Sequence, residues 1–221
     1  MKRVAAAAEH RRAMVARLRR QGLRDPRVLA ALAAVPRERF VPEALASRAY
    51  EDARLPIGEG QTISHPWTVG RLAELLQVSA GDKVLEVGTG SGYQAAVLAA
   101  MGLRVFSLER RPALARSAAA RLRELGFLGV TVKNFDGTYG WAAEAPFDGI
   151  VVTAGGPEVP PALLRQLRDG ARLVMPIARD GRQRLLVVTR QGKRFVEEDH
   201  GPASFVPLIG RFGYPTPPGR S

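Results

Sequence analysis

The sequence predicts an α/β protein built on a doubly wound, mostly parallel sheet. From Lys83 onward, short apolar runs alternate with helical stretches, and most of these runs are apolar at every position. Strands that are apolar on both faces are typical of a parallel sheet covered by helices on either side. A glycine-rich turn follows the first run, at a position where open α/β sheets bind ligands.

A helical extension is expected before the sheet. Residues 2–21 carry apolar side chains at three-to-four spacing, which predicts a helix. Asp25 and Pro26 suit the cap and the first position of a second helix. Residues 37–65 are rich in Pro and Gly and are expected to be irregular, and Pro66 marks the start of the helix that leads into the sheet.

The alternating part predicts five strands and three helices, followed by an antiparallel hairpin. The predicted strands are 84–87, 105–108, 130–132, 150–153 and 173–177, and the helices are 93–101, 112–125 and 160–167. The hairpin joins 185–189 to 195–196 through a Gln191-Gly192 turn. The chain therefore divides into an N-terminal helical region with a loop, the sheet with its helices, and a Pro- and Gly-rich C-terminal segment: residues 1–65, 66–200 and 201–221.

Composition excludes several classes of protein. A chain of 221 residues with 46% hydrophobic and 24% charged residues is long enough and apolar enough to form a buried core. The absence of cysteine excludes a disulfide scaffold, thiolate metal sites and a cysteine nucleophile. No apolar run approaches the roughly 20 residues that span a bilayer, and the N-terminus lacks a secretory core, so a cytoplasmic protein is expected.

Positive charge is concentrated near the N-terminus. The net charge is +12, and the first forty residues contribute +8 of it through eleven Lys and Arg against three Asp and Glu. Such an arm could bind nucleic acid. The alternative is a solvated helix in a chain whose base composition favours arginine, with 29 Arg against 4 Lys. The alternative is favoured because runs of charge usually lie on solvated faces.

The most informative segment is Val84–Tyr93, where a predicted strand runs into glycines at 88, 90 and 92 and then into a helix. Glycines let a backbone turn sharply and approach a ligand closely. The third glycine comes one position too early for a dinucleotide fingerprint, and the loop lacks the lysine of a P-loop. Glu86 would repel phosphates and suits a ligand that carries a cation.

Acidic residues also follow the next two predicted strands. Glu109 ends the second strand and could accept hydrogen bonds from ribose hydroxyls. Asp136-Gly137 ends the third strand and could reach an adenine edge. A single acid after a strand is more often a helix cap, but with the glycines these residues predict a cofactor site at the ligand-binding edge of the sheet.

Several segments, in order along the chain, resemble the protein-L-isoaspartate O-methyltransferase family of bacterial type. They are Thr62-Ile63-Ser64-x-Pro66, Val84–Gln94, Asp136-Gly137, Ala145–Asp148 and Phe205–Leu208. The resemblance implies a Rossmann-like class I fold and methyl transfer from S-adenosyl-L-methionine, without a metal. The acceptor is the free α-carboxylate of L-isoaspartyl residues in damaged proteins and peptides, and the ester then closes to a succinimide that starts repair. Asn134-Phe135 departs from the glycine that relatives commonly carry before the acid, which could alter the adenine pocket.

The resemblance also implies site residues. Ser64 is the expected catalytic residue and binds substrate together with Val206, Pro207 and Leu208. The expected cofactor-binding residues are Thr62, Ile63, Glu86, Gly88, Thr89, Gly90, Ser91, Gly92, Glu109, Asp136 and Gly137. For Ser64 the alternative is a cap of the helix that begins at Pro66. A carboxylate acceptor with a pKa of about 4 is already ionised at neutral pH, so no general base is required.

Two other functions remain as alternatives. One is a nucleic-acid methyltransferase on the same sheet, disfavoured because the chain lacks an Asn-Pro-Pro-Tyr-like motif, cysteine chemistry and basic–aromatic interleaving. The other is a non-catalytic protein that binds nucleic acid through its basic arm, disfavoured by the intact glycine loop and acids. We expect a monomer that binds neither a membrane nor a specific nucleic acid.

Overall fold

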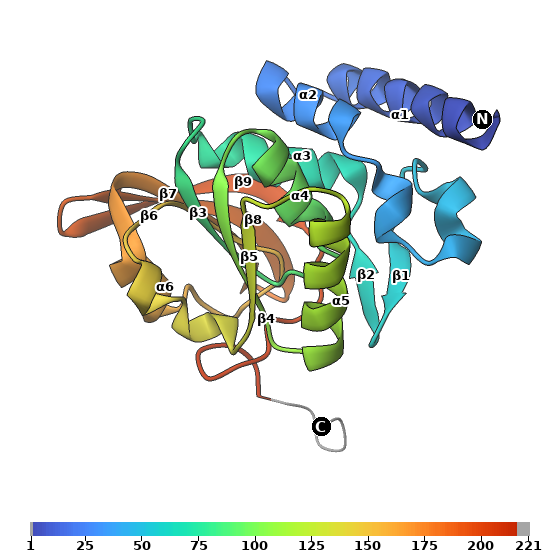
Figure 1. The fold of residues 1–221 in the computed structure, drawn as a ribbon. Coiled ribbons are helices and arrows are strands. Elements are labelled where there is room, and N and C mark those ends of the chain that lie inside the picture. Colours follow the sequence, from blue (N-terminus) through green and yellow to red (C-terminus); the bar gives the residue numbers. More distant parts are fainter. Residues whose placement is uncertain (1, 216–221) are drawn as a thin grey trace.

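A central sheet of seven strands organises the molecule (Figure 1). The computed structural model describes residues 2–215, with side chains from residue 7 onward. The strands are β3 Lys83–Val87, β4 Arg104–Glu109, β5 Val130–Asn134, β6 Phe147–Val152, β7 Leu167–Arg179, β8 Arg182–Gln191 and β9 Arg194–Ala203. Their order in the sheet is β5-β4-β3-β6-β7-β8-β9. The first five run parallel, and β8 and β9 each run antiparallel to the strand before them, so the predicted sheet and closing hairpin are confirmed.

Helices cover both faces of this sheet. They are α3 Pro66–Leu76, α4 Tyr93–Ala100, α5 Pro112–Glu124 and α6 Pro161–Gln166. Residues of α3, α4 and α5 share one buried cluster with Val84 and Val105. Leu163 of α6 joins a second cluster with Leu85 and Phe147. Adjacent residues of β3 therefore enter opposite cores, as expected for a strand buried on both faces.

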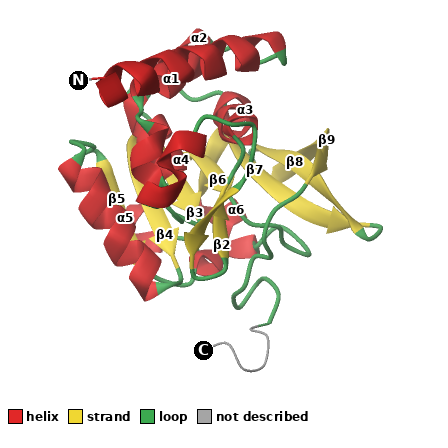
Figure 2. Cartoon of the chain, turned by 90° about the vertical axis from the view of Figure 1, so that its right-hand side faces the viewer, coloured by secondary structure: helices red, strands yellow, loops and turns green. Residues whose placement is uncertain are grey.

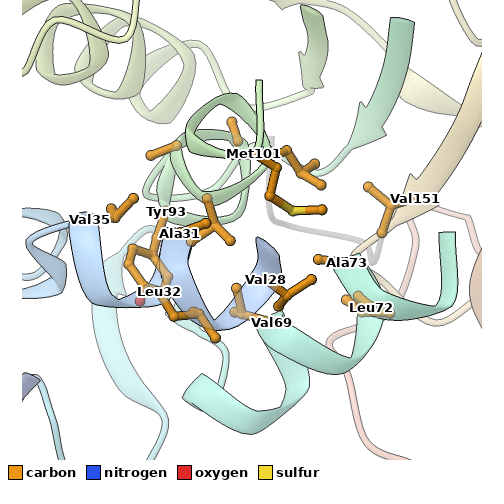
Figure 3. Close-up of a cluster of buried hydrophobic side chains, with 14 of the residues drawn as sticks. Val28, Ala31, Leu32, Val35, Val69, Leu72, Ala73, Tyr93, Met101 and Val151 are labelled. Atoms are coloured by element: carbon orange, nitrogen blue, oxygen red, sulfur yellow. The ribbon is translucent and has the colours of Figure 1, made fainter. Parts of the chain in front are cut away.

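The N-terminal helices pack against the helices of the sheet (Figures 1 and 2). They are α1 Lys2–Arg20 and α2 Pro26–Ala34. Asp25 caps α2 as predicted, accepting the backbone N–H of Arg27 at 2.8 Å. Figure 3 shows the shared core, which includes Val28, Ala31, Leu32 and Val35 of α2, Val69, Leu72 and Ala73 of α3, Tyr93, Met101 and Val151. This core contains residues from both sides of the predicted boundary at residue 65. The division into residues 1–65, 66–200 and 201–221 therefore stays a prediction about the functional roles of these segments.

The segment predicted to be irregular contains regular elements. Two 3₁₀ turns, η1 Arg37–Phe40 and η2 Glu43–Arg48, precede an antiparallel pair of strands, β1 Leu55–Gly58 and β2 Gln61–Ile63. The turn between these strands is made by residues 58–60, all with positive φ. Strands of three or four residues are too short for alternation to be recognised in a sequence.

The sheet also extends beyond its predicted strands. β7 begins at the buried Leu167, where a helix was expected to end, and the next three residues, 168–170, are exposed. β9 runs to Ala203, and of the C-terminal segment, residues 216–221 lie outside the described part of the chain. Among the described residues, no helix has the length and apolar composition needed to cross a membrane.

Candidate active site

A cavity of about 260 Å³ lies at the carboxyl ends of the parallel strands. Such ends are where open α/β sheets bind ligands, because loops leave the sheet there and helix N-termini point toward the opening. The cavity joins segments that are far apart in the sequence. Its lining consists of residues 60–64, Val69, 87–91, Tyr93, Gln94, 108–111, Gly137, Thr153, Ala154 and 206–209.

The glycine loop lets three strand ends converge on this cavity. The backbone N–H of Gly88 donates to the carbonyl of Leu108 at 2.8 Å, which ties β3 to β4. The Thr153 hydroxyl donates to the Gly88 carbonyl at 2.7 Å, which ties the loop to the end of β6. Gly88 has φ +100°, and a Cβ at this position would collide with the Thr153 hydroxyl. A side chain at residue 88 is therefore excluded both by conformation and by space.

Glu109 is held at the cavity by two backbone groups. Its carboxylate accepts the N–H of Gly90 and the N–H of Arg111, each at 2.9 Å. The side chain is only 6% exposed and lines the cavity. A carboxylate oxygen can accept more than one hydrogen bond, so both oxygens keep acceptor capacity for hydroxyl groups of a ligand.

Glu86 lies beneath the loop and outside the cavity lining. It is fully buried, and its Oε2 accepts the hydroxyl of Ser107, which in turn lies 2.6 Å from the Thr89 hydroxyl. Its Oε1 has no partner among the described residues. Burial raises the pKa of Glu86 to about 8, against the opposing effect of the Ser107 hydrogen bond. Within the described residues, the side-chain hydrogen bonds of Glu86 therefore lead to the cavity through Ser107 and Thr89.

Two other expected cofactor residues also lie outside the lining. Gly92 precedes α4 and faces Leu122 and Ala118 of α5, so its lack of a side chain serves helix packing. Asp136 caps a 3₁₀ turn, and its Oδ2 accepts the backbone N–H of Arg211 at 2.9 Å. This contact directs the Asp136 carboxylate toward the C-terminal segment. The other expected cofactor residues, Thr62, Ile63, Gly88, Thr89, Gly90, Ser91, Glu109 and Gly137, all line the cavity.

Ser64 lines the cavity and does not cap α3. The N-cap position is His65, and no side-chain hydrogen bond caps the helix. The interpretation of Ser64 as a helix cap is therefore wrong. The Ser64 carbonyl accepts a hydrogen bond from Arg37 at 2.8 Å, and Arg37, fully buried, also donates to the carbonyl of Ala49 at 2.7 Å.

The C-terminal segment forms the wall of the cavity that includes Val206, Pro207 and Leu208. The N–H of Gly155 donates to the Val206 carbonyl, and the N–H of Leu208 donates to the Gly155 carbonyl, both at 2.8 Å. These bonds anchor the segment to the chain that leaves β6. All four residues expected to bind substrate thus border the same cavity as the glycine loop.

Several lining residues were not predicted. Gln94 is 6% exposed, and neither atom of its amide has a hydrogen-bond partner among the described residues. Tyr93 is buried, which raises the pKa of its phenol to about 12, and the Arg37 guanidinium lies 4.8 Å from its ring centre. Arg111 pairs with Glu59 of the β1–β2 turn at 3.2 Å. Gln94 and Tyr93 come directly after the glycine loop, and this position could have indicated that they line the cavity.

The described residues contain no group of three or more His, Asp or Glu side chains that could hold a metal ion. The residues that line the cavity instead bring hydroxyls, backbone N–H groups, the Glu109 carboxylate and two arginines, Arg110 and Arg111. Such a lining suits an organic ligand that carries several hydrogen-bonding groups.

Comparison with known proteins places the chain among relatives of similar length. The chain is 52% identical over 196 residues to a protein-L-isoaspartate O-methyltransferase of Syntrophotalea carbinolica, covering 88% of this chain and 90% of that one. It is 51% identical over 208 residues to protein-L-isoaspartate O-methyltransferase 2 of Marinobacter nauticus, covering 93% and 95%.

Solved structures share the fold. A structure named protein-L-isoaspartate O-methyltransferase superposes with a TM-score of 0.84 at 29% identity, covering 92% of this chain and 67% of that one. A putative Plasmodium falciparum enzyme of the same name, in complex with S-adenosyl-L-homocysteine, gives 0.78 at 24% identity, covering 90% and 98%. The sequence profile of one family matches residues 9–213. The chain belongs to the protein-L-isoaspartate(D-aspartate) O-methyltransferase (PCMT) family.

Proposed function

We propose that this protein transfers a methyl group from S-adenosyl-L-methionine to the free α-carboxylate of L-isoaspartyl residues in damaged proteins and peptides. Family membership over residues 9–213 supports the reaction. The observation that carries the proposal is the single cavity that joins the glycine loop and Glu109 to Ser64 and residues 206–208. A donor and an acceptor bound to these two sides would meet within it.

The residues on the loop side fit the cofactor. Glu109 has acceptor capacity left for ribose hydroxyls, and Gly90 leaves room above the loop, where an added Cβ would have Ile57 Cδ1 as its nearest neighbour, at 3.5 Å. Gln94 also lines the cavity, and its side-chain amide has no hydrogen-bond partner among the described residues. We assign cofactor binding to Thr62, Ile63, Gly88, Thr89, Gly90, Ser91, Glu109 and Gly137, and keep Glu86, Gly92 and Asp136 as predictions.

The chain contributes positioning rather than proton transfer. When bound, S-adenosyl-L-methionine supplies a methyl group already activated by a positively charged sulfur. The acceptor carboxylate is ionised at neutral pH and needs no base. Ser64 would donate its hydroxyl to one carboxylate oxygen and leave the other aimed into the cavity, while the walls exclude water from the two opposite charges.

The substrate side of the cavity suits a peptide backbone. The Val206–Leu208 segment is fixed through Gly155 and would lie along the substrate chain. An isoaspartyl linkage carries one more backbone carbon than an aspartyl linkage and a free α-carboxylate. We propose that the distance between Ser64 and this segment accommodates that longer linkage. The methyl ester leaves the enzyme and closes to a succinimide, whose hydrolysis returns some aspartate.

A methyl-transfer assay with a matched pair of peptides tests this function. An isoaspartyl peptide and its aspartyl twin are incubated with radiolabelled S-adenosyl-L-methionine, and base-labile methyl ester is counted. We expect ester on the isoaspartyl peptide alone, followed on long incubation by partial conversion to the aspartyl form. Equal labelling of the two peptides, or none, would contradict the proposal.

We further propose that the protein acts in the cytoplasm as a monomer. The acceptors are then intracellular proteins and peptides that have aged. Sedimentation equilibrium should return the mass of one chain, 23.9 kDa. A mass of twice that value, independent of protein concentration, would contradict the monomer.

A further inference from the structure

A second pocket lies beside the candidate active site and has no assigned role. Its volume is about 250 Å³, close to that of the cavity described above. It lies between α3, Leu185 of β8, the end of β9 with the residues that follow it, and the chain before β1. The lining combines apolar, aromatic and cationic side chains and consists of Arg54, Trp67, Thr68, Arg71, Leu185, Pro202, Ala203, Ser204 and Phe205.

This flanking pocket, defined by those nine residues, continues the two segments that border the substrate side of the active site. Trp67 follows Ser64 by three residues, and Phe205 directly precedes Val206. Because consecutive Cα atoms are 3.8 Å apart, Trp67 and Ser64 are separated by at most about 11 Å. An extended peptide advances roughly 3.3 Å per residue, so this distance corresponds to no more than about three substrate residues.

The walls of the flanking pocket are fixed by hydrogen bonds. The side-chain amide of Gln183 holds Phe205 at both backbone groups, accepting its N–H at 2.6 Å and donating to its carbonyl at 3.1 Å. Arg71 donates to Glu74 at 2.9 Å and lies 3.4 Å from His200. The Phe205 and Arg71 walls are therefore held in place within the protein, which reduces the entropy lost when a side chain packs against them.

Arg54 gives this pocket a positive charge that no neighbour neutralises. Its side chain is exposed and makes no hydrogen bond or ion pair within residues 7–215. The acids beside it in sequence are engaged elsewhere. Asp52 contacts Gln21 and His65, and Glu51 pairs with Arg48.

We propose that the flanking pocket binds a glutamate side chain located within three residues of the isoaspartyl residue in the protein substrate. The apolar walls, including Trp67 and Phe205, suit the methylene groups of glutamate, and Arg54 suits its carboxylate. Arg71 adds a second positive charge, although Glu74 already shares it. The proposal rests on the proposed function and adds a preference for substrate sequence to it.

Matched isoaspartyl peptides test this preference. Each peptide carries Glu or Gln at one of the six positions from three before to three after the isoaspartyl residue, and KM and kcat are measured for methyl ester formation. We expect one position at which Glu lowers KM about threefold relative to Gln, the size typical of an exposed ion pair. Arg54→Glu should reverse this preference, and Arg54→Lys should retain it.

Arg194→Glu is the matched control, because it makes the same change of charge at an exposed position on β9, outside the pocket. It should leave the ratio of KM values unchanged. Equal KM values for Glu and Gln at all six positions would overturn the proposed role of the flanking pocket and leave the proposed function intact. The same conclusion would follow if Arg194→Glu changed the ratio of KM values as much as Arg54→Glu does. If no isoaspartyl peptide is methylated, the proposed function fails and the pocket's role with it.

Discussion

Ser64 owes its place at the cavity to contacts of its backbone. Its carbonyl accepts a hydrogen bond from the buried Arg37, which also binds the carbonyl of Ala49. Burial lowers the pKa of Arg37 from its usual value, because the charged guanidinium is removed from water. The two carbonyls compensate part of that cost and fix the backbone of residue 64. The Ser64 hydroxyl caps no helix, which is consistent with its proposed role in binding the substrate carboxylate.

Ser64→Ala should lower kcat for an isoaspartyl peptide about 10- to 100-fold, the effect of one hydrogen bond to a charged group. Affinity for S-adenosyl-L-homocysteine, measured by calorimetry, should stay within about twofold. Ser79→Ala, at an exposed loop residue, is the control and should retain full activity. Unchanged kinetics for Ser64→Ala would remove its hydroxyl from the reaction.

Glu86 should make stability depend on pH. Its pKa is raised by burial to about 8 in the folded protein, so between about pH 4.5 and pH 8 the folded state binds more protons than the unfolded state. Stability therefore falls as pH rises through this window, by at most about 1.4 kcal/mol per pH unit.

Glu86→Gln removes this contribution, and urea unfolding at a series of pH values should show a smaller decline than in the wild type. Glu43→Gln, at an exposed position, should leave the decline unchanged. Parallel pH profiles for wild type and Glu86→Gln would contradict a raised pKa at this residue.

At the scale of elements, α1 is part of the folded core. Met14 and Leu18 are fully buried, and Arg17 donates to the carbonyl of Tyr50 at 2.9 Å. Arg12, Arg19 and Arg20 are exposed. The helix therefore combines a face that packs in the core with a basic face. Deleting the helix would remove both at once, so an effect on stability could not be separated from an effect on binding.

Separate substitutions distinguish the two faces of α1. Leu18→Ala should lower the free energy of unfolding by about 2–5 kcal/mol in urea titrations, as expected for a large core residue. The triple change of Arg12, Arg19 and Arg20 to Gln should alter stability little and reduce salt-sensitive retention on a DNA column. Sequence-specific DNA binding that persists at physiological salt would instead favour the nucleic-acid alternative.

The elements differ in how well the sequence predicts them. Most of the parallel strands were found because their residues are apolar on both faces, and α2 was found because Asp25 and Pro26 mark its start. The β1–β2 pair was missed because its strands, of four and three residues, are too short to show an alternation of apolar and polar residues. The start of β7 was missed because its polar residues hide a strand that pairs with β6.

At the scale of the whole molecule, the site depends on segments that the sheet brings together. Motifs predicted which segments would meet, and residues 62–64, 88–91 and 206–208 do border one cavity. They did not predict side-chain direction. Glu86 shares a face of β3 with Val84 and is buried there, and Asp136 binds Arg211, a contact between residues 75 positions apart. Such long-range contacts leave no local pattern in a sequence.

We propose that one cavity holds the methyl donor on the side of Glu109 and receives the acceptor on the side of Ser64. A crystal structure grown with S-adenosyl-L-homocysteine tests it most directly. We predict electron density inside the cavity, with the ribose hydroxyls at the Glu109 carboxylate and the sulfur facing Ser64. If the protein binds the ligand in solution but its crystals show an empty cavity, or the ligand bound elsewhere, this cavity is not the donor site.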